Sequence, residues 1–509
     1  MPLNKRALLP ILVAGLLVSG CVGIRPSPLT ADEIAATNRS DRETARAAVE
    51  PIDHPLTLEE AIARALKYNL ERRTRLIEEA IALNQLDVSQ YDMLPKLAAA
   101  AGYTHRNEDL VARARDSVTG EPSLANPFIS SDRSHSLYSL GLTWNLLDFG
   151  VSYYTAKQNA DRVLIAMERR RKAMHVLIQD VRTAFWRAAS AQKLKGELRE
   201  AIALAEQALA DARAAEQERL RSPIDSLRYQ RQLLENLRLL EAIDQELSTA
   251  RVELAHLVNA PFEPELLVVE PADALGKRML DIPVERMEEV AMAQNADLRE
   301  QFYNARIARD ETRRALLRLF PSLSFSYELK RDTDSFLVHN RWTQAGAQLS
   351  WNLFNVFAAP SQMRLGDAGV ALADQRRMAT QMAVLAQVHL ARLQFANAWQ
   401  QYDRADAIWV VDEKINQQVA NRERVQAQSK LDRVANNTTA ILSLLRRYQS
   451  LAQAHAAANR LQATLGMELE VGSVQDLSLA QLTAAVGTAL KDWQDGRMPE
   501  PRRPEGKGS

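Results

Sequence analysis

The sequence predicts a mainly α-helical protein with a membrane β-barrel portion, built from a helix–strand–strand–helix–helix unit that occurs twice. Three observations predict this class. A set of residues repeats along the chain, long stretches lack proline, and four short segments alternate apolar with polar residues. The chain has 509 residues, of which 46% are hydrophobic, so it has enough apolar side chains for a large core.

The repeat is visible in matched residues of the two halves. Trp144-Asn-Leu recurs as Trp351-Asn-Leu 207 positions later, and this shift also relates Ser222-Pro-Ile-Asp225 to Ser429-Lys-Leu-Asp432. Upstream the shift is 226 positions, as between Asn69 and Asn295, so the first copy has a longer connection between its strands. Long-range self-similarity indicates one structural unit written twice.

This repeat sets the expected domain boundaries. We predict a signal peptide, a lipid-anchored extended segment, a first repeat, an equatorial linker, a second repeat and a C-terminal equatorial segment with a disordered tail. Their boundaries are 1–20, 21–55, 56–260, 261–282, 283–466 and 467–509.

The only cysteine, Cys21, follows an apolar N-terminal run. Lys5 and Arg6 precede this run, which is shorter than the roughly 20 residues that span a bilayer. The sequence Val18-Ser-Gly-Cys21 resembles the lipobox of bacterial lipoproteins, in which the signal is removed and the cysteine is acylated. We predict lipidation (palmitate) at Cys21; the alternative is a cleaved secretory signal beside an incidental cysteine. In the lipoproteins that this sequence resembles, an acidic residue after the cysteine favours inner-membrane retention. The residue here is Val22, which favours the outer membrane.

Long segments without proline predict long helices. No proline occurs from 128 to 222, from 224 to 260 or from 361 to 498. A helix over 151–220 would be roughly 105 Å long at 1.5 Å per residue. Apolar residues at alternating steps of three and four favour coiled-coil packing, with an ordinary helical bundle as the alternative. The stripes are Leu164, Met167, Met174, Ile178, Val181, Phe185 and Ala188, and Leu233, Leu237, Leu240, Leu247, Leu254 and Val258.

Four segments alternate with period two, which is typical of strands with one apolar and one polar face. We predict strands at about 97–106, 135–147, 322–330 and 342–353. Segments of roughly ten residues with aromatic ends fit transmembrane β-strands, although a single one would also fit a sheet outside the membrane. The expected lipid-facing aromatic residues are Tyr103, Tyr138, Trp144, Phe325, Tyr327 and Trp351.

Four strands are too few to close a membrane barrel, for which eight is about the minimum. An open sheet edge is not tolerated in lipid, because its backbone groups would have no hydrogen-bond partners. We therefore expect the chain to associate, with two or three copies supplying eight or twelve strands.

The combined pattern resembles the TolC-type outer-membrane efflux proteins, and the lipid-anchored branch most. The resemblance rests on the lipidated start, the two copies of the unit, Leu56-Thr-Leu-Glu-Glu-Ala-Ile62 and the landmarks Asn69 and Pro95. It implies a homotrimer with a 12-stranded β-barrel in the outer membrane of a Gram-negative bacterium, continued by a periplasmic α-helical coiled-coil barrel. It also implies a periplasmic adaptor (membrane fusion) protein and an inner-membrane pump of RND or ABC type as partners.

On this layout the connections 106–134 and 330–341 face the outside of the cell. The turns at 219–225 and 424–432 then form the periplasmic tip, where Ser222 and Ser429 are good helix N-caps. Helix capping alone accounts for these residues, whereas the functional interpretation is a gate of crowded ion pairs. The gate candidates are Asp225, Asp432, Arg219, Arg221, Arg422 and Arg424.

No catalytic motif occurs in the sequence, and we predict no enzyme activity, no cofactor and no metal site. The balanced 64 basic and 64 acidic residues argue against a nucleic-acid partner. The eight histidines are expected at the surface or in the lining of the tunnel. The resulting hypothesis is a passive outer-membrane conduit, and the alternative is a lipid-anchored coiled-coil structural or adaptor protein without a pore.

Overall fold

The computed structural model describes residues 26–113, 115–122, 127–217, 223–262, 266–269, 276–425, 429–469, 471–472 and 474–497. The chain divides into two compact units, Met1–Pro51 and Ile52–Ser509. The expected signal peptide and Cys21 lie outside the described residues, and so do the last residues of the tail.

The described part of the first unit is an exposed helix, α2 (Ala31–Ala47). Its start is a capping box: the Thr30 hydroxyl accepts from the Glu33 N–H at 3.3 Å, and the Glu33 carboxylate accepts from the Thr30 N–H at 2.8 Å. The prediction of an extended segment is therefore wrong for 31–47, because Thr30 and Glu33 together start a helix.

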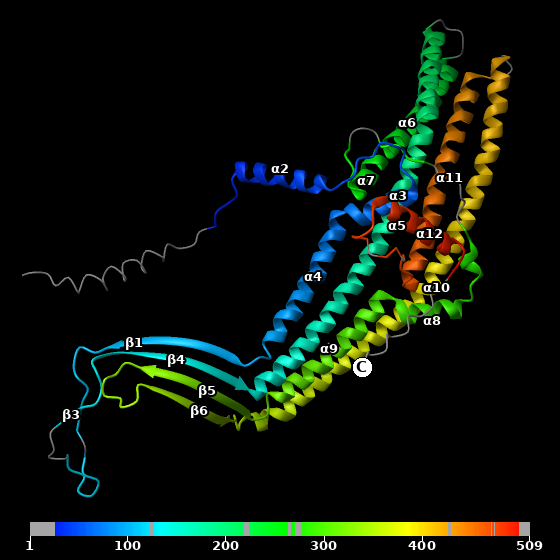
Figure 1. Ribbon diagram of the computed structural model, residues 1–509. Coiled ribbons are helices and arrows are strands. Elements are labelled where there is room, and N and C mark those ends of the chain that lie inside the picture. Colours follow the sequence, from blue (N-terminus) through cyan, green and yellow to red (C-terminus); the bar gives the residue numbers. More distant parts are fainter. Residues whose placement is uncertain are drawn as a thin grey trace, which may run out of the picture. The chain divides into compact units, whose positions relative to one another are not determined.

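The second unit contains the long helices and the strands (Figure 1). Its elements are α3 (Leu58–Tyr68), α4 (Leu70–Tyr91), β1 (Lys96–His105), β2 (Val111–Ala112), β3 (Phe128–Ile129), β4 (Ser134–Asn145), α5 (Leu146–Gln217), α6 (Pro223–Ser248), α7 (Ala250–Leu257), a 3₁₀ turn at Arg278–Asp281, α8 (Val284–Gln294), α9 (Ala296–Leu317), β5 (Ser322–Asp332), β6 (Arg341–Ser350), α10 (Asn355–Arg424), α11 (Lys430–Leu465) and α12 (Leu479–Gln494).

Two asparagines make equivalent turns between short and long helices. Asn69 ends α3 and caps α4, accepting from the Arg72 N–H at 3.0 Å, and Asn295 does the same between α8 and α9 with the Leu298 N–H at 3.1 Å. Their amide groups donate to the carbonyls of Leu257 (3.1 Å) and Thr464 (2.8 Å). One polar side chain therefore fixes both the helix start and the neighbouring helix end at each site.

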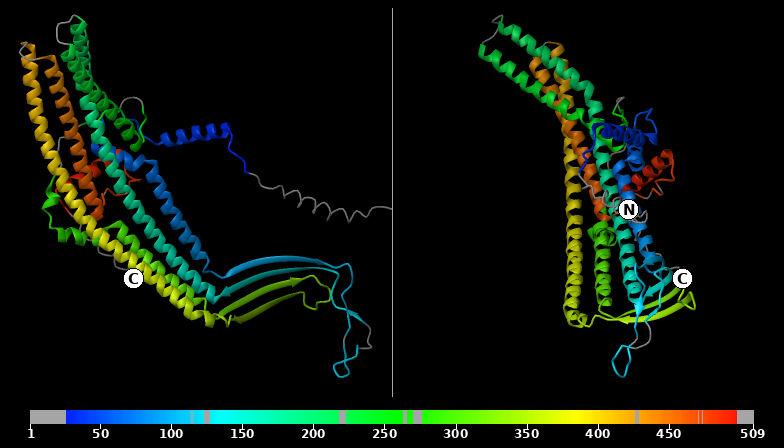
Figure 2. Two further views of the ribbon diagram at one scale, coloured as in Figure 1. Left: turned by 180° about the vertical axis from the view of Figure 1, so that it is seen from behind. Right: turned by 90° about the vertical axis from the view of Figure 1, so that its left-hand side faces the viewer.

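The helices α5, α6, α10 and α11 pack along one another, as the contacts and the views in Figure 2 agree. With 72 residues, α5 is about 108 Å long at 1.5 Å per residue. Its expected apolar stripe is buried from Met174 to Ala188, but Met167 is exposed and Leu164 only partly buried. In that first part Ile165 is buried instead, because α5 presents a different face to α9.

Gly466 ends α11 in the left-handed conformation, with φ at 71°. A Cβ atom here would lie 2.3 Å from the carbonyl oxygen of Gln294. Glycine is required both by the backbone angle and by the close approach of the α8–α9 turn.

The four long strands form one antiparallel sheet in the order β1–β4–β5–β6 (Figure 1). It is open among the described residues, with β1 and β6 at its edges, and β2 and β3 form a separate small hairpin in the longer connection. Two strand ends differ from the prediction. Leu146 starts α5 rather than ending β4, and β6 stops at Ser350, before Trp351.

Segments on both sides of the repeats pack around α3. The Leu56 N–H donates to the Leu267 carbonyl, and the Val269 N–H donates to the Leu56 carbonyl, both at 2.8 Å. The C-terminal helix α12 packs against α3, burying Leu482 and Val486 completely. The residues around Val268 and the helix α12 thus lie beside Leu56 and α3, respectively. That 261–282 and 467–509 form an equatorial belt stays a prediction.

A polar cluster is buried between α5 and α11. The Arg182 guanidinium donates to His455 Nδ1 at 2.9 Å, and the His455 ring stacks on Trp186 with centroids 5.0 Å apart. Burial lowers the pKa of His455, and the nearby Arg182 lowers it further; burial and Arg171 lower the pKa of His175 to about 4. The expectation of surface or tunnel-lining histidines was therefore wrong for these two, because they are buried.

Candidate functional site

One face of the four-stranded sheet carries large apolar side chains that are exposed. The strand register places them in rows across neighbouring strands, for example Leu97–Leu142–Tyr327–Ala345 and Ala99–Leu140–Leu329–Thr343. Leu142 is 42% exposed and Tyr327 is 49% exposed. A face of this kind needs an apolar surrounding, because so much contiguous apolar surface is unfavourable in water.

The opposite face is small and polar over most of its length, with Trp342 and Leu137 at its loop end. One of its rows is Ala98–Gly141–Glu328–Gln344, and Lys96–Thr143–Ser326–Gly346 follows it. The Lys330 ammonium pairs with Glu328 at 2.6 Å and donates to Gln344 at 3.1 Å on this face. The alternation predicted from the sequence is therefore present in the register of all four strands.

The expected lipid-facing aromatic residues lie mostly on the apolar face. Between β4 and β5, Trp144 is paired in register with Phe325, Tyr138 with Arg331, and Tyr327 with Leu142. Tyr103 lies near the end of β1. Trp351 was expected within a strand but lies just past β6, where its indole N–H donates to the Leu319 carbonyl at 3.0 Å.

Further exposed aromatic residues gather where strands meet helices, and the sequence interpretation missed them. Trp144 packs edge-on against Phe149 with centroids 5.9 Å apart, and Phe354 packs near Phe357 at 6.4 Å. Both phenylalanines of the second pair are more than three-quarters exposed. Their position, within seven residues of a predicted strand end, is the signal that would have found them, since aromatic girdles border the apolar band of membrane barrels.

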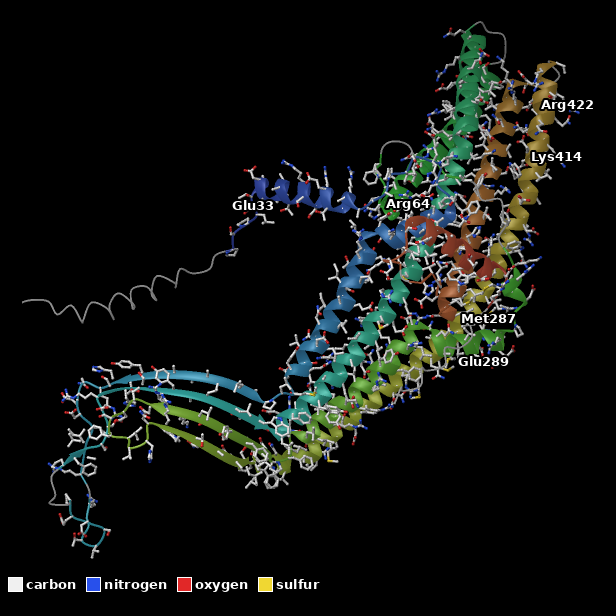
Figure 3. The ribbon with its side chains drawn as sticks, viewed as in Figure 1. Glu33, Arg64, Met287, Glu289, Lys414 and Arg422 are labelled. Carbon is white, nitrogen blue, oxygen red and sulfur yellow. The ribbon has the colours of Figure 1, made fainter. Side chains whose placement is uncertain are left out.

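The other candidate site lies where α5 and α10 end and where α6 and α11 begin. Arg219 and Arg221 lie outside the described residues, as does Ser222. Ser429 caps α11, because its hydroxyl accepts from the Asp432 N–H at 3.2 Å and donates to the Asp432 carboxylate at 2.7 Å. Arg422 and Arg424 lie in the last turn of α10, where Figure 3 labels Arg422.

The carboxylate of Asp225 is exposed and lies 3.9 Å from the guanidinium of Arg228 on the same helix. Two ion pairs that the sequence did not indicate connect different helices near this end. Arg433 of α11 pairs with Glu423 of α10 at 2.9 Å, and Lys430 of α11 pairs with Asp211 of α5 at 2.5 Å. The hydrogen bond to Asp211 raises the pKa of Lys430.

Among the described residues, no group of three or more histidine, cysteine or acidic side chains is arranged to hold a metal ion. None of the helices that the structure describes is long and apolar enough to cross a membrane.

The fold of this chain, a four-stranded sheet continued by helices of 72 and 70 residues, is similar to the folds of solved outer membrane channels. The CmeC outer membrane channel of Campylobacter jejuni is 14% identical with a TM-score of 0.63, and the match covers 93% of this chain and 98% of that one. A membrane protein from Pseudomonas aeruginosa is 16% identical with a TM-score of 0.61, and the match covers 83% of this chain and 92% of that one. The open MtrE outer membrane channel of Neisseria gonorrhoeae is 17% identical with a TM-score of 0.58, and the match covers 80% of this chain and 88% of that one. No protein-family model and no curated protein matches the sequence. The likeness shows the fold and confirms the predicted resemblance to TolC-type channels at that level.

Proposed function

We propose that this chain is the outer-membrane conduit of a tripartite export system in a Gram-negative bacterium. It passes substrates from an inner-membrane pump of RND or ABC type and a periplasmic adaptor (membrane fusion) protein to the outside. The observation that carries the proposal is the four-stranded sheet whose exposed face is apolar in every strand. Solved outer membrane channels with this fold support it.

The proposed assembly is a homotrimer with twelve strands. Both edge strands, β1 and β6, have free edges in a single chain, and in lipid those edges need strands from other copies. Apolar side chains are also exposed along α4 and α10, where neighbouring copies would cover them to form the coiled-coil barrel. They include Ile77, Ile81, Val88, Leu372, Met382, Leu393, Ile408 and Val411.

We also propose that the chain is a duplicated unit, with repeats at 56–260 and 283–466. The order of two helices, two strands, a long helix and a further helix occurs twice along the chain. Asn69 and Asn295 make the same two kinds of hydrogen bond in both copies. The segments 261–282 and 467–497 would then form the belt around the middle of the assembly.

The alternative, a lipid-anchored adaptor without a pore, is not favoured. A coiled-coil adaptor has no use for a sheet whose exposed face is apolar, because such a surface causes aggregation in water. The test is the oligomer itself. We expect the detergent-extracted protein to have the mass of three chains and to conduct ions in planar bilayers. A monomer without conductance would contradict the proposal.

The lipid anchor is a separate proposal. With Cys21→Ser we expect the signal to remain uncleaved by the lipoprotein peptidase and acyl labelling to disappear, because the acylated sulfur is lost. Some transport activity should remain, since the barrel itself holds the protein in the membrane. The measurement is mass spectrometry of the mature N-terminus, and a start at any residue other than Cys21 would refute the anchor.

The gate at the helix ends is proposed to be held by crowded charges, among them Arg219, Arg221, Arg422, Arg424, Asp225 and Asp432. Near a symmetry axis such charges are partly shielded from water, where ion pairs gain more than the roughly 0–1 kcal/mol of an exposed pair. Replacing Arg424 and Asp432 together by alanine should then raise single-channel conductance while leaving the trimer intact.

A matched control separates the gate from helix capping. Ser429→Ala removes the cap of α11 at a cost of about 1 kcal/mol but keeps every charge. We expect wild-type conductance for this variant. If the double variant also conducts like the wild type, capping is the only role left for Asp432.

A further inference from the structure

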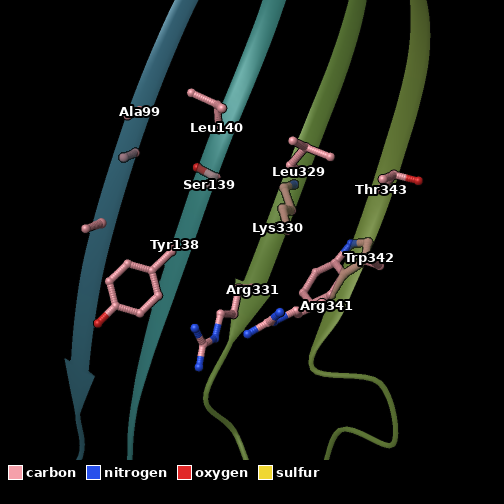
Figure 4. A pocket seen from close by; sticks show the side chains of 12 residues that line it. Ala99, Tyr138, Ser139, Leu140, Leu329, Lys330, Arg331, Arg341, Trp342 and Thr343 are labelled. Carbon is pink, nitrogen blue, oxygen red and sulfur yellow. The ribbon is translucent and has the colours of Figure 1, made fainter.

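Two arginines lie side by side at the loop end of the apolar sheet face. Arg331 of β5 is paired directly with Arg341 of β6, and Tyr138 of β4 is paired with Arg331 on its other side. Figure 4 shows the three side chains as one row that borders a pocket of about 650 Å³. Like charges directly opposite each other on neighbouring strands repel, so an anion bound to this row would relieve the repulsion.

The described part of the chain supplies no such charge. No ion pair or hydrogen bond joins either guanidinium to a carboxylate there, and both side chains are exposed. The sequences of β1, β4 and β6 contain no acidic residue, and in β5 Glu328 and Asp332 alternate onto the opposite face. Pairing the β6 edge with the β1 strand of another copy would therefore bring no carboxylate either.

The next residue along β5 is the contrasting case. Lys330 points to the polar face, where Glu328 and Gln344 satisfy its ammonium at 2.6 and 3.1 Å. Within the described residues, the basic side chain on one face has partners, and the two basic side chains on the other face have none. This difference indicates that the partner of the arginine row comes from outside the protein.

The position along the strand identifies the surroundings. Along the apolar face of β5, Leu323, Phe325, Tyr327 and Leu329 are followed by Arg331, the first charged side chain on that face. A charged side chain is costly inside the apolar band of a membrane barrel and is tolerated at its border, so Arg331 marks the end of the band. Since the β5–β6 connection faces outward in the proposed function, Arg331 and Arg341 are at the level of the outer-leaflet headgroups.

We propose that Arg331, Arg341 and Tyr138 bind the phosphate group of a phosphorylated glycolipid in the outer leaflet. A phosphate oxygen pair matches the planar fork of a guanidinium, and one phosphate can accept from two adjacent arginines at once. The Tyr138 hydroxyl is a further donor in the same row. Leu140 and Leu329, one row deeper, contact the acyl chains. This inference rests on the proposed function, because it requires the sheet to be in the membrane.

The test uses the full-length chain purified as its oligomer in detergent micelles without divalent cations. Fluorescently labelled lipid A with both phosphates is titrated, and binding is measured by anisotropy. With Arg331→Gln and Arg341→Gln together we expect the dissociation constant to rise at least about tenfold, because hydrogen bonds to charged groups are lost. Lys330→Gln is the matched control, since it removes the neighbouring positive charge from the opposite face, and it should bind like the wild type.

Two further arms identify the ligand. Lipid A with its phosphates removed should bind wild-type protein at least about tenfold more weakly, which tests the site even if the double variant fails to assemble. Millimolar inorganic phosphate should not displace the lipid, and displacement would overturn the choice of a lipid as ligand. Equal binding by the wild type and the double variant, or equal binding of both lipids, would overturn the site.

Planar-bilayer recordings of the wild type separate this inference from the proposed function. If the protein conducts as an oligomer but binds lipid A regardless of its phosphates, only the proposed lipid site is wrong. If it forms no conducting oligomer, the proposed function is wrong, and the lipid site with it.

Discussion

Replacing Leu142 by arginine should prevent stable insertion of the assembled channel, whereas Thr143→Arg should be tolerated. Leu142 lies on the apolar face of β4, three residues before the strand ends, between Leu97 of β1 and Tyr327 of β5. An arginine facing lipid near the midplane costs about 2–4 kcal/mol, and the proposed homotrimer would carry three copies of the change. Thr143 lies between Lys96 and Ser326 on the polar face, where an added guanidinium stays in water.

The measurement is the fraction of heat-resistant or cross-linked trimer in outer-membrane fractions, with total protein as the reference. The two variants differ by one position and add the same side chain, so each is the control of the other. Equal loss for both would show that the assigned faces of β4 are wrong. Equal tolerance would show that neither face is exposed to lipid.

The second large effect is expected on acidification, which should destabilise the helical region because two buried histidines would have to take up protons. His175 and His455 are almost completely buried and close to Arg171 and Arg182, respectively. The Nδ1 atom of His455 accepts a hydrogen bond from Arg182, which only the neutral ring can do. Protonation would break this bond and place a second positive charge beside the buried guanidinium, whose own pKa burial lowers to about 10.

The direction follows from the two states of His175. Its pKa is about 4 in the folded protein against an ordinary value of 6.5, so the unfolded chain binds the proton first as pH falls. The stability from keeping this ring neutral is fully present above pH 6.5 and is lost as pH falls from there to about 4. A pKa difference of this size between the folded and unfolded states corresponds to about 3 kcal/mol of folding stability. The lowered pKa of His455 acts in the same direction.

Thermal unfolding between pH 7.5 and 4.5 measures this effect. We expect the wild-type melting temperature to fall steeply below pH 6.5, and the fall to be smaller for a variant with His175→Gln and His455→Gln. His256→Gln, which removes an exposed histidine of α7, should keep the wild-type pH dependence. A pH profile of the double variant that matches the wild type would assign the acid sensitivity to other groups.

The parts of the fold that the sequence predicted correctly depend on local chemistry. The proline-free segments contain α5 and most of α10, which begins at Asn355 and includes Pro360 near its start. The apolar alternation corresponds to β1, β4, β5 and β6 with the expected faces. The strand ends were less well predicted, because Leu146 and Trp351 continue the apolar pattern after the backbone has left the sheet. The helix α2 was missed although its Thr30–Glu33 capping box is a local signal.

The candidate sites divide in the same way. The Ser429 cap depends on residues three positions apart, and its pattern in the sequence was sufficient. The ion pairs Arg433–Glu423 and Lys430–Asp211 connect different helices, so no sequence spacing indicates them. The gate itself stays a prediction, since Arg219 and Arg221 lie outside the described residues.

By itself, the sequence determined where this chain is helical, where it alternates as strands, and which strand face is apolar, because these features follow from periodicity and breakers within short segments. Only the tertiary structure decided which distant residues meet. It brings Arg182 to His455, 273 positions away, and it sets Arg331 opposite Arg341 with no acid on their face. Such contacts depend on helix packing and strand register, and many sequences with the same pattern would place different charges together.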